Sequence, residues 1–218
     1  MAEPHAVICP LCEDRRASIF RRVDGQDYFR CPTCRLTFQD PATLPPLCEE
    51  KAQYDLHEND PEDEGYRRFL DQLGAPLRER LDTGAKGLDF GCGPGPALAR
   101  LMEEHGHPCA VYDPIYAPDS AVLAQQYDFV TCTEVLEHLH RPGREWQQFA
   151  RLVKPGGWLG LMTRWLTDDD GFDRWHYRRD PTHVCFWQPD TFRWLSSQQG
   201  WNLILIGNPV VLMQRSGH

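Results

Sequence analysis

The sequence lacks any apolar run long enough to cross a membrane. A bilayer-spanning helix needs about 20 consecutive apolar residues, and the 218-residue chain contains no such run. Its first residues, Met1-Ala2-Glu3-Pro4-His5, also lack the basic start and apolar core of a secretory signal. These two absences predict a protein without a membrane span that resides in the cytoplasm.

The chain also lacks an excess of basic residues. It has 23 Lys and Arg against 32 Asp and Glu, a formal net charge of −9. Phosphate contacts need clustered positive charge, so this balance argues against a general nucleic-acid binder. Several arginines gather near the N-terminus, but acids lie in the same stretch, which favours a mixed, solvated surface.

A disulfide framework is not expected, because the nine cysteines are an odd number and no secretory signal accompanies them. Four of them form two CxxC pairs, Cys9/Cys12 and Cys31/Cys34. Four thiolates so paired can close a tetrahedral Zn²⁺ site, and the residues between the pairs suit a hairpin turning at Asp24-Gly25. The pattern predicts a zinc ribbon in residues 1–45, whose structural Zn²⁺ supplies folding free energy and no catalysis. A decayed site and redox chemistry are the alternatives.

The remaining chain divides into two further parts. Residues 46–83 follow a proline-rich stretch and are predicted to form an acidic linker with helices near 66–73 and 76–81. Residues 84–218 alternate strand and helix, which predicts a doubly wound, Rossmann-like α/β domain with a mostly parallel sheet. The expected strands are 87–90, 109–113, 129–132 and 158–163, the helices 96–106, 145–153 and 189–199, and an antiparallel C-terminal hairpin spans 201–206 and 210–214.

A glycine-rich loop joins the first of these strands to a helix. In Gly91-Cys92-Gly93-Pro94-Gly95 the glycines allow a sharp turn and close approach to a ligand, and the helix start offers unpaired N–H groups. Alone, such a loop suits a dinucleotide, S-adenosylmethionine (SAM) or only a tight turn. Asp113, at the end of the next strand, is placed to accept hydrogen bonds from a ribose diol.

Four motifs in order resemble the class I SAM-dependent methyltransferases. They are Leu-Asp-Phe-Gly-Cys-Gly-Pro-Gly at 88–95, Tyr-Asp-Phe-Val at 127–130, Glu-Val-Leu-Glu-His at 134–138 and Leu-Val-Lys-Pro-Gly-Gly at 152–157. The resemblance covers roughly residues 84–164 and implies SAM as the cofactor. The residues it implies for SAM binding are Asp89, Gly91, Cys92, Gly93, Gly95, Asp113, Thr133 and Glu134.

Within that set, the glycines would pass under the methionine portion of SAM, Asp89 would support the loop or the SAM amino group, and Asp113 would hold the ribose. One departure concerns the adenine. Only a short segment separates Asp113 from Asp128, too little for the helix and strand that the family usually places there. The adenine contacts are therefore left unassigned.

The candidates for chemistry lie in residues 134–138 and in the His- and aromatic-rich loop 175–187. If 134–138 form a helical turn, Glu134, Glu137 and His138 share one face. Polyprenyl-hydroxyquinol O-methyltransferases and small-RNA 3′-terminal 2′-O-methyltransferases carry a similar Glu-x-x-Glu-His and a later His. That resemblance implies an Mg²⁺-type ion, held by Glu134, Glu137, His138 and His183, that orients an acceptor hydroxyl; His176 rivals His183.

The catalytic candidates are therefore His183, Glu134, His138 and His176. A different interpretation stays open, in which Glu134 and His138 only shape the SAM pocket, Glu137 faces solvent and His183 is a base or a packed histidine. The aromatic residues near 186–194 suit either an acceptor pocket or the core, and Trp194 fits the core by helical spacing.

Three functions follow from these patterns. The first is methyl transfer from SAM to oxygen of a small-molecule acceptor. The second is a methyltransferase that uses the ribbon to dock RNA or protein, against which the acidic net charge counts. The third is a SAM- or zinc-binding interaction protein without activity, which the shortened segment after Asp113 would favour.

Overall fold

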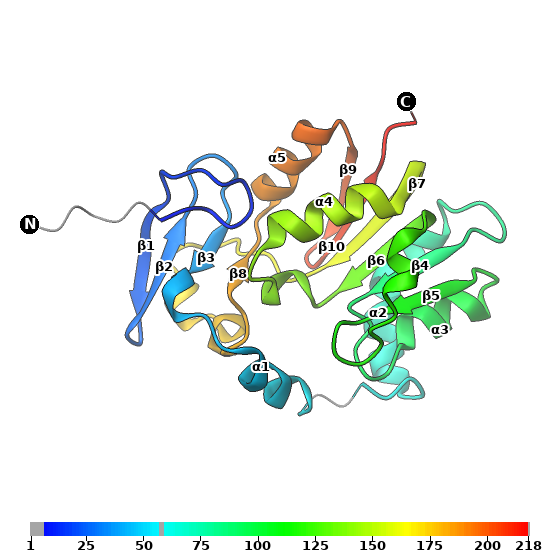
Figure 1. Ribbon diagram of the computed structural model, residues 1–218, viewed down its shortest axis with the longest axis horizontal. Helices are drawn as coiled ribbons and strands as arrows, with labels where there is room; N and C mark the ends of the chain where they lie inside the picture. Colours follow the sequence, from blue (N-terminus) through cyan, green and yellow to red (C-terminus); the bar gives the residue numbers. More distant parts are fainter. Residues whose placement is uncertain (1–6, 57–58, 218) are drawn as a thin grey trace, which may run out of the picture.

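The structure, a computed structural model, describes residues 7–56 and 59–217 and contains two β-sheets (Figure 1). The larger has six strands in the order β5-β4-β6-β7-β10-β9, and the smaller has four in the order β1-β2-β3-β8. Residues 1–5, where the lack of a secretory signal was predicted, lie outside the described residues. No helix in the described part of the chain is long and apolar enough to cross a membrane.

The six-stranded sheet is mostly parallel, as the sequence predicts. Its strands are β4 (Gly87–Phe90), β5 (Cys109–Tyr112), β6 (Tyr127–Thr133), β7 (Val153–Met162), β9 (Asn202–Gly207) and β10 (Val210–Gln214). The first four pair in parallel, whereas β10 runs antiparallel to both β7 and β9. Short apolar strands separated by helices favour parallel pairing, and the tight link at residues 208–209 favours a hairpin. The predicted C-terminal hairpin is therefore confirmed.

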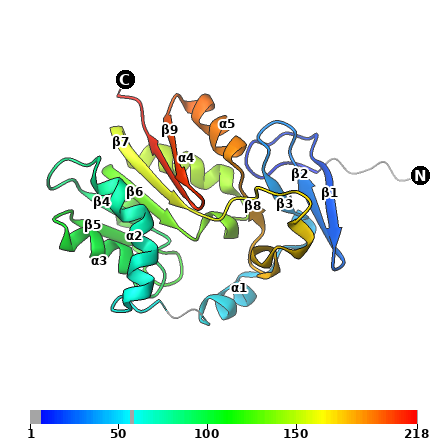
Figure 2. The same ribbon diagram turned by 180° about the vertical axis from the view of Figure 1, so that it is seen from behind.

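Helices cover both faces of this sheet (Figures 1 and 2). They are α2 (Glu64–Arg78) and α3 (Ala97–Glu104) on one face, and α4 (Pro142–Leu152) and α5 (Pro189–Gln199) on the other. Alternation along β6 shows why two cores form: Phe129 packs with α2 and α3, whereas Val130 packs with α4 and α5. The carboxyl ends of β4, β5 and β6 stay open between these layers.

One prediction in the linker is wrong. The sequence suggested two helices that meet before Pro76, but α2 is a single helix that runs through this proline. Pro76 lies in the last turn of α2, so the helix ends only two residues beyond the point where the proline removes a backbone N–H. The Asp63 side chain caps the helix by accepting a hydrogen bond from the Tyr66 amide at 2.5 Å.

The smaller sheet links the N-terminal segment to a distant part of the chain. Its strands are β1 (Ser18–Val23), β2 (Gln26–Arg30), β3 (Thr37–Gln39) and β8 (Cys185–Phe186), all antiparallel to their neighbours. The hairpin at Asp24-Gly25 forms as predicted, whereas neither β3 nor β8 was expected. A helix, α1 (Leu47–Tyr54), lies in the predicted linker.

Five short 3₁₀ segments connect these elements in the described part of the chain. They are η1 (Pro41–Thr43), η2 (Ser120–Ala124), η3 (Leu136–His138), η4 (Phe172–Arg174) and η5 (His176–Arg179). The segment η2 occupies the short stretch between β5 and β6, so this connection holds no further strand, as its length predicts.

Candidate active site

The loop after β4 lies so close to its neighbours that side chains would not fit. Gly91 and Gly93 have φ values of +76° and +64°, in the left-handed region that favours glycine. A Cβ atom on Gly91 would lie 2.4 Å from Cγ2 of Val135, and one on Gly95 would lie 1.9 Å from the carbonyl oxygen of Asn59. The glycines thus permit a backbone cradle at the start of α3.

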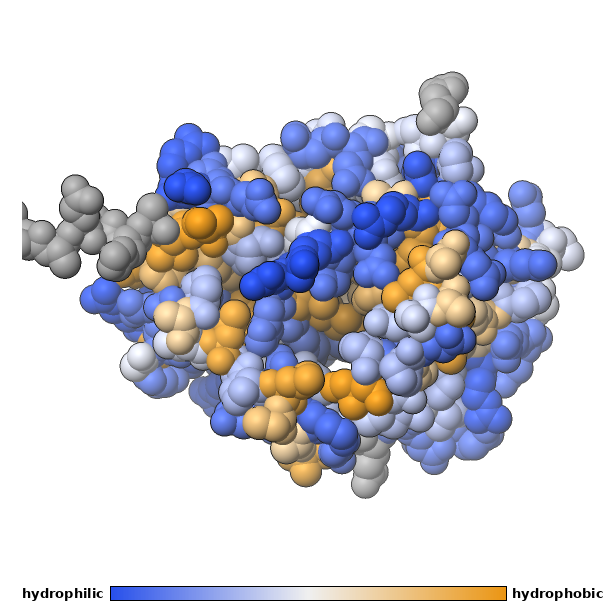
Figure 3. Space-filling view, in the orientation of Figure 1, coloured by the Kyte–Doolittle hydropathy of each residue, from blue (hydrophilic) through white to orange (hydrophobic). Residues whose placement is uncertain are grey.

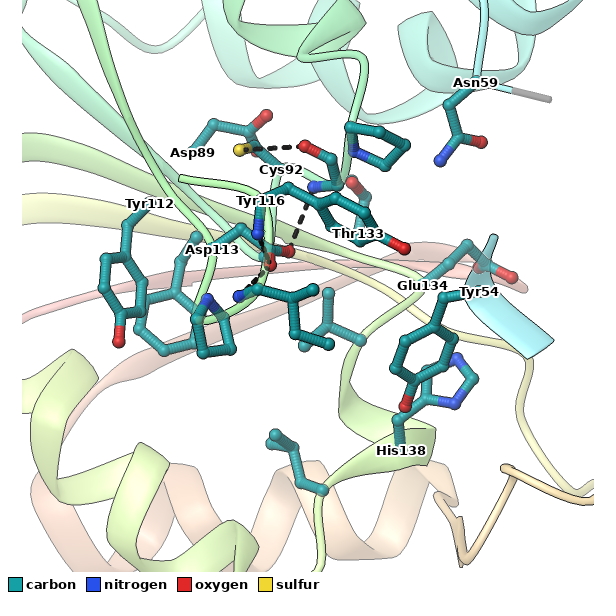
Figure 4. Close-up of a pocket in the computed structure, with 18 of the residues that line it drawn as sticks. Tyr54, Asn59, Asp89, Cys92, Tyr112, Asp113, Tyr116, Thr133, Glu134 and His138 are labelled. Atoms are coloured by element: carbon teal, nitrogen blue, oxygen red, sulfur yellow. Dashed lines mark hydrogen bonds between the residues drawn. The ribbon is translucent and has the colours of Figure 1, made fainter. Parts of the chain in front are cut away.

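Asp113 joins this loop to the next one (Figure 4). Its Oδ2 accepts a hydrogen bond from the Gly93 amide at 3.1 Å. Its Oδ1 accepts from the amides of Ile115 and Tyr116 at 2.8 and 3.0 Å. One carboxylate therefore fixes the loops at the carboxyl ends of β4 and β5 against each other.

Asp89 supports the same loop from within the sheet. It is 2% exposed, and its Oδ1 accepts a hydrogen bond from Oγ1 of Thr131 at 2.7 Å. Burial raises the pKa of Asp89 to about 6, although hydrogen bonds from Thr131 and from the Ala99 amide oppose the rise. These contacts tie β4 to β6 and to α3.

A cavity of about 620 Å³ opens at the carboxyl ends of β4, β5 and β6. Its size is that of a small-molecule site, for which ~300–1,000 Å³ is usual. The glycine loop and Asp113 form one side, and η3 with His183 forms the other. Figure 3 shows this face of the molecule hollowed between α1 and the body of the protein.

The lining of this cavity is acidic. Among the residues that the structure describes, it includes no lysine or arginine. Its carboxylates belong to Glu50, Asp89, Asp113, Glu134, Glu137, Glu145 and Asp180. Those of the seven acids that are ionised make the potential in the cavity negative, so the lining attracts cations and repels anions.

Glu137 is fully buried, so the interpretation in which it faces solvent is wrong. Its Oε1 accepts a hydrogen bond from the Tyr177 hydroxyl at 2.5 Å, and its Oε2 accepts from Oγ1 of Thr163 at 2.9 Å. Burial raises the pKa of Glu137, while nearby His183 and these hydrogen bonds oppose the rise. The carboxylate is held in one orientation by two donors.

His138 and His183 lie beside Glu137, with ring centroids 4.7 Å apart. Nδ1 of His138 lies 3.1 Å from the carbonyl oxygen of Thr182, and Nδ1 of His183 lies 2.6 Å from that of Tyr177. Because a carbonyl only accepts, each Nδ1 carries the proton and each Nε2 carries the lone pair. Burial also lowers the pKa of His183, which favours its neutral form.

Glu137, His138 and His183, called the histidine group below, have the geometry of a metal site. One ligand atom from each of Glu137, His138 and His183 lies within 4.8 Å of the others. Imidazoles whose second nitrogen bonds a backbone carbonyl, beside a carboxylate held by donors, are typical of divalent-cation sites. The residues present therefore fit a divalent ion.

Glu134 and His176 lie apart from this group. Glu134 precedes η3 with a φ of +51°, so the helical turn expected to place it beside Glu137 does not include it. It lines the same cavity; its Oε1 is buried and accepts no hydrogen bond from the described residues, and burial followed by the charge of Glu137 raises its pKa to about 9. His176 lines a separate cavity of about 330 Å³ with Arg164 and Trp175.

The four cysteines of the two CxxC pairs converge in the N-terminal module. Sγ of Cys9 lies 3.5 Å from that of Cys34, Sγ of Cys12 lies 3.4 Å from that of Cys31, and all four lie within 4.8 Å of one another. Tetrahedral Zn–S bonds of ~2.3 Å place sulfurs about 3.8 Å apart. The cluster is therefore compatible with a small zinc site.

Comparison with known families decides the class of protein. Residues 62–206 match a family described as a methyltransferase domain. The chain belongs to the class I SAM-dependent methyltransferases. The resemblance found in the sequence is thereby confirmed, and with it the doubly wound fold.

Several curated relatives of this methyltransferase share one name. The chain is 34% identical over 117 residues to a ubiquinone biosynthesis O-methyltransferase of Thiobacillus denitrificans. The match covers 40% of this chain and 50% of the relative. It is 35% identical over 132 residues to the protein of that name from Paracidovorax citrulli, covering 50% and 52%. The chain thus spans about half the length of these relatives.

Two solved structures share the fold. One is a 1,6-didemethyltoxoflavin-N1-methyltransferase of Burkholderia thailandensis with bound 1,6-didemethyltoxoflavin and S-adenosylhomocysteine (SAH). Its TM-score is 0.55 at 14% identity, and the match covers 88% of this chain and 96% of that one. The other is an O-methyltransferase family protein of the same organism, with a TM-score of 0.51, 18% identity, and coverage of 77% and 63%. At these identities the likeness establishes the fold alone.

The methyltransferase's cofactor candidates lie together at one end of the cavity. Asp89, Gly91, Cys92, Gly93, Asp113, Thr133 and Glu134 all line it, and Gly95 lies in the same loop. The thiol of Cys92 donates to the Gly93 carbonyl at 3.4 Å, which strengthens the turn (Figure 4). A cradle that a Cβ would fill, next to a carboxylate, fits SAM; the role of each single residue stays a prediction.

Other residues at the cavity were not singled out from the sequence. The Tyr54 ring packs edge-on against His138 at 5.1 Å, as Figure 4 shows, and Oε1 of Glu50 lies 2.9 Å from Nε2 of His140. No motif marks residues 47–54, so only the tertiary fold reveals these contacts. Tyr177 was visible only as part of the aromatic loop.

The aromatic residues after His183 belong to the core. Phe186, Trp187 and Phe192 are at most 1% exposed, and the last two stack at 5.4 Å. None of the three lines the cavity. Of the two interpretations of this aromatic segment, the structure supports packing.

Proposed function

We propose that this chain transfers a methyl group from SAM to an oxygen atom of a small-molecule acceptor. The observation that carries the proposal is a single cavity that joins the glycine loop to Glu137, His138 and His183. A ligand on the loop and an acceptor at the histidines would meet inside it. The relatives named O-methyltransferases support oxygen as the methylated atom.

The chain's own contribution to this reaction is alignment. SAM supplies a methyl group on a positively charged sulfur. Holding an acceptor in line with that group is the main demand of such a displacement, and the glycine loop and the histidine group lie on opposite sides of the cavity to meet it. The acidic lining suits a cationic cofactor.

Glu137, His138 and His183 would hold a Mg²⁺-type divalent ion, with Glu134 on the wall of the same cavity. Such an ion supplies a lowered hydroxyl pKa and a fixed orientation of the acceptor oxygen. Around it, Tyr177 and Thr163 orient the carboxylate. Without an ion, His183 would accept the acceptor's proton at Nε2.

The acceptor class follows from the charge of the lining. A cavity with seven acidic side chains, and no lysine or arginine among its described residues, favours a neutral or cationic molecule. A phosphate ester or a nucleic acid would need positive charges at the same place. The lining therefore supports a small molecule over RNA as the acceptor.

Replacement of His183 tests the proposal, and the rival His176 gives the comparison. Production of SAH is measured with a panel of dihydroxy aromatic acceptors in Mg²⁺ or Mn²⁺. We expect His183→Ala to lower turnover by about 10²-fold or more while SAH affinity is kept, and His176→Ala to behave as the wild type. Full activity of His183→Ala, or an equal loss in His176→Ala, would contradict the proposal.

We also propose that Cys9, Cys12, Cys31 and Cys34 hold one structural Zn²⁺. The convergence of four sulfurs supports it. With four protein ligands the ion would have no open position for catalysis and would contribute to folding. Elemental analysis is expected to find one zinc per chain; protein without zinc, whose N-terminal module resists chelation, would refute the assignment.

A further inference from the structure

The N-terminal module, defined here as residues 7–39, extends its sheet onto the strand that follows His183. In that sheet β3 pairs with β8 through Thr37 opposite Phe186 and Phe38 opposite Cys185. The amide of Gln39 donates to the carbonyl of Val184 at 2.9 Å. A strand of only two residues gains its order from its partner strand, so β3 sets the path of the chain after His183.

Val184 connects the module to the backbone around Glu137 and His138. Its carbonyl accepts from Gln39, and its own amide donates to the carbonyl of Glu137 at 2.8 Å. The thiol of the next residue, Cys185, donates to the carbonyl of Leu139 at 3.2 Å. The backbone on both sides of His138 is thus bonded to the segment that β3 holds.

A second connection runs from the β1–β2 hairpin through η5. Arg178 donates to Oδ2 of Asp24 at 2.8 Å and lies 3.4 Å from the Tyr28 hydroxyl. The preceding residue, Tyr177, accepts from Nδ1 of His183 through its carbonyl and donates to Glu137 through its hydroxyl. The module therefore holds the segment whose Tyr177 orients both His183 and Glu137.

The cysteine cluster itself packs on the same region. The carbonyl of Pro10, inside the first CxxC pair, accepts from the Gly143 amide at 3.2 Å, and a Cβ on Gly143 would lie 2.6 Å from the Leu11 carbonyl oxygen. Cys9 and Cys34 share a core with Leu136 of η3. The core around α2 and α3, behind the glycine loop, includes no residue of the module among those described.

We propose that the N-terminal module is an internal brace that positions His183 and Glu137, so that zinc in its cysteines controls the acceptor half of the cavity and leaves the SAM half intact. Tyr177 is the main positioning residue between module and site. The zinc dependence rests on the proposed zinc site, whereas the brace rests only on the contacts above. This assignment differs from a docking module, which would need its contacts turned outward.

Zinc removal from the full-length protein tests the first part. Chelation, followed by restoration with Zn²⁺, is monitored by side-chain ¹⁵N spectra of the histidines and by calorimetry with SAH. We expect the imidazole signals of His183 and His138 to shift reversibly, those of buried His107 to stay, and SAH affinity to change by less than about twofold. Unchanged His183 signals in zinc-free protein would overturn the zinc control.

Phe38→Ala tests the brace without touching a cysteine, and Leu77→Ala is the matched control. Both side chains are at most 1% exposed; Phe38 belongs to β3, and Leu77 belongs to α2, in the core that includes no described residue of the module. Only Phe38→Ala is expected to shift the imidazole ¹⁵N signals of His183 and to weaken Mn²⁺ binding by about tenfold or more. Both variants are expected to keep the wild-type affinity for SAH. Equal effects of the two variants would overturn the brace.

A gentler pair covers the case in which Phe38→Ala fails to fold. Asp24→Asn removes the charge that faces Arg178, and Asp27→Asn removes one that faces Arg22 on the same hairpin. The brace predicts a shift of the Tyr177 and His183 signals in Asp24→Asn alone. If purified protein holds no zinc, the proposed zinc site is refuted. These four variants still test whether the N-terminal module positions His183.

Discussion

At the scale of single residues, two constraints require a glycine at position 91: the backbone conformation and the lack of space for a side chain. The φ of +76° at Gly91 disfavours any side chain, and a Cβ would also meet Val135 at 2.4 Å. Gly84 has a similar φ of +73° but open space around a Cβ. Both alanine variants share a backbone cost of about 1–2 kcal/mol, so any difference between them reports the close approach.

We therefore expect Gly91→Ala to weaken SAH binding, because Val135 lines the cavity and would have to move. Calorimetry should show a loss of about tenfold or more, which corresponds to about 1.4 kcal/mol. Gly84→Ala should lower the melting temperature and keep SAH affinity. Equal SAH affinities of the two variants would show that the loop does not carry the cofactor.

Asp89 predicts a pH dependence of stability. Its folded-state pKa of about 6 lies above the usual value for a free aspartate, because the carboxylate is buried. Between the unfolded pKa, ~3.9, and about 6 the folded state binds more protons, so the free energy of unfolding falls as pH rises through this window. In Asp89→Asn the side chain does not titrate in this range, and its amide oxygen can still accept the hydrogen bond from the Thr131 hydroxyl.

The variant is expected to gain stability relative to the wild type between pH 4.5 and pH 7.5, by an amount on the order of 2 kcal/mol. Urea unfolding at the two pH values measures the difference. Parallel pH profiles of the two proteins would show that Asp89 titrates normally. In that case its burial would have no electrostatic cost.

At the scale of elements, the loop after β7 is held to the N-terminal module by Arg30 and Asp169. The guanidinium donates to both carboxylate oxygens at 2.5 and 2.7 Å, and the Arg30 side chain is 10% exposed. These bonds lower the pKa of Asp169, which burial opposes. The depressed pKa means that the stabilisation is present above ~3.9 and is lost as pH falls below it.

Asp169→Asn is therefore expected to lower the melting temperature at pH 7 by about 2–4 °C, for a loss near 1 kcal/mol of a half-exposed pair. The difference should shrink toward pH 3. Asp170→Asn, whose side chain is 98% exposed, is the matched control and should change stability by less than about 0.5 kcal/mol. A constant difference across this pH range would exclude the ion pair as its source.

The sequence predicted the elements that local patterns determine. Alternating apolar strands, the glycine loop and the hairpin at Asp24-Gly25 depend on neighbouring residues, and they form as expected. The strands β3 and β8 were missed because both are short and because their pairing joins residues far apart in the sequence, which no local pattern shows. Helix α1 was missed for a similar reason: its contacts with His138 and His140 are tertiary.

The candidate site shows the same division. The motif Glu-Val-Leu-Glu-His correctly places Glu137 and His138 at the cavity, and the later aromatic loop supplies His183. Glu134 departs from the expected helical face because its φ is positive, which the spacing does not reveal. The choice between His176 and His183 also needed the fold, since both lie in one loop and line different cavities.

At the scale of the whole molecule, the two sheets meet at the histidine group. The six-stranded sheet supplies the glycine loop, Asp113 and η3, and the four-stranded sheet supplies the strand after His183. The cavity therefore draws its cofactor half from one sheet and its acceptor half from both. This division is why damage to the N-terminal module is expected to affect the two halves unequally.

A crystal structure of the full chain with SAH and Mn²⁺ would show whether the cofactor and the ion occupy the two halves of one cavity. We expect SAH to lie against Gly91–Gly95 with its sulfur facing the histidines. We also expect an anomalous manganese peak at about 2.0–2.3 Å from ligand atoms of Glu137, His138 and His183. SAH bound away from the glycine loop, or manganese bound elsewhere while this group stays empty, would contradict these expectations.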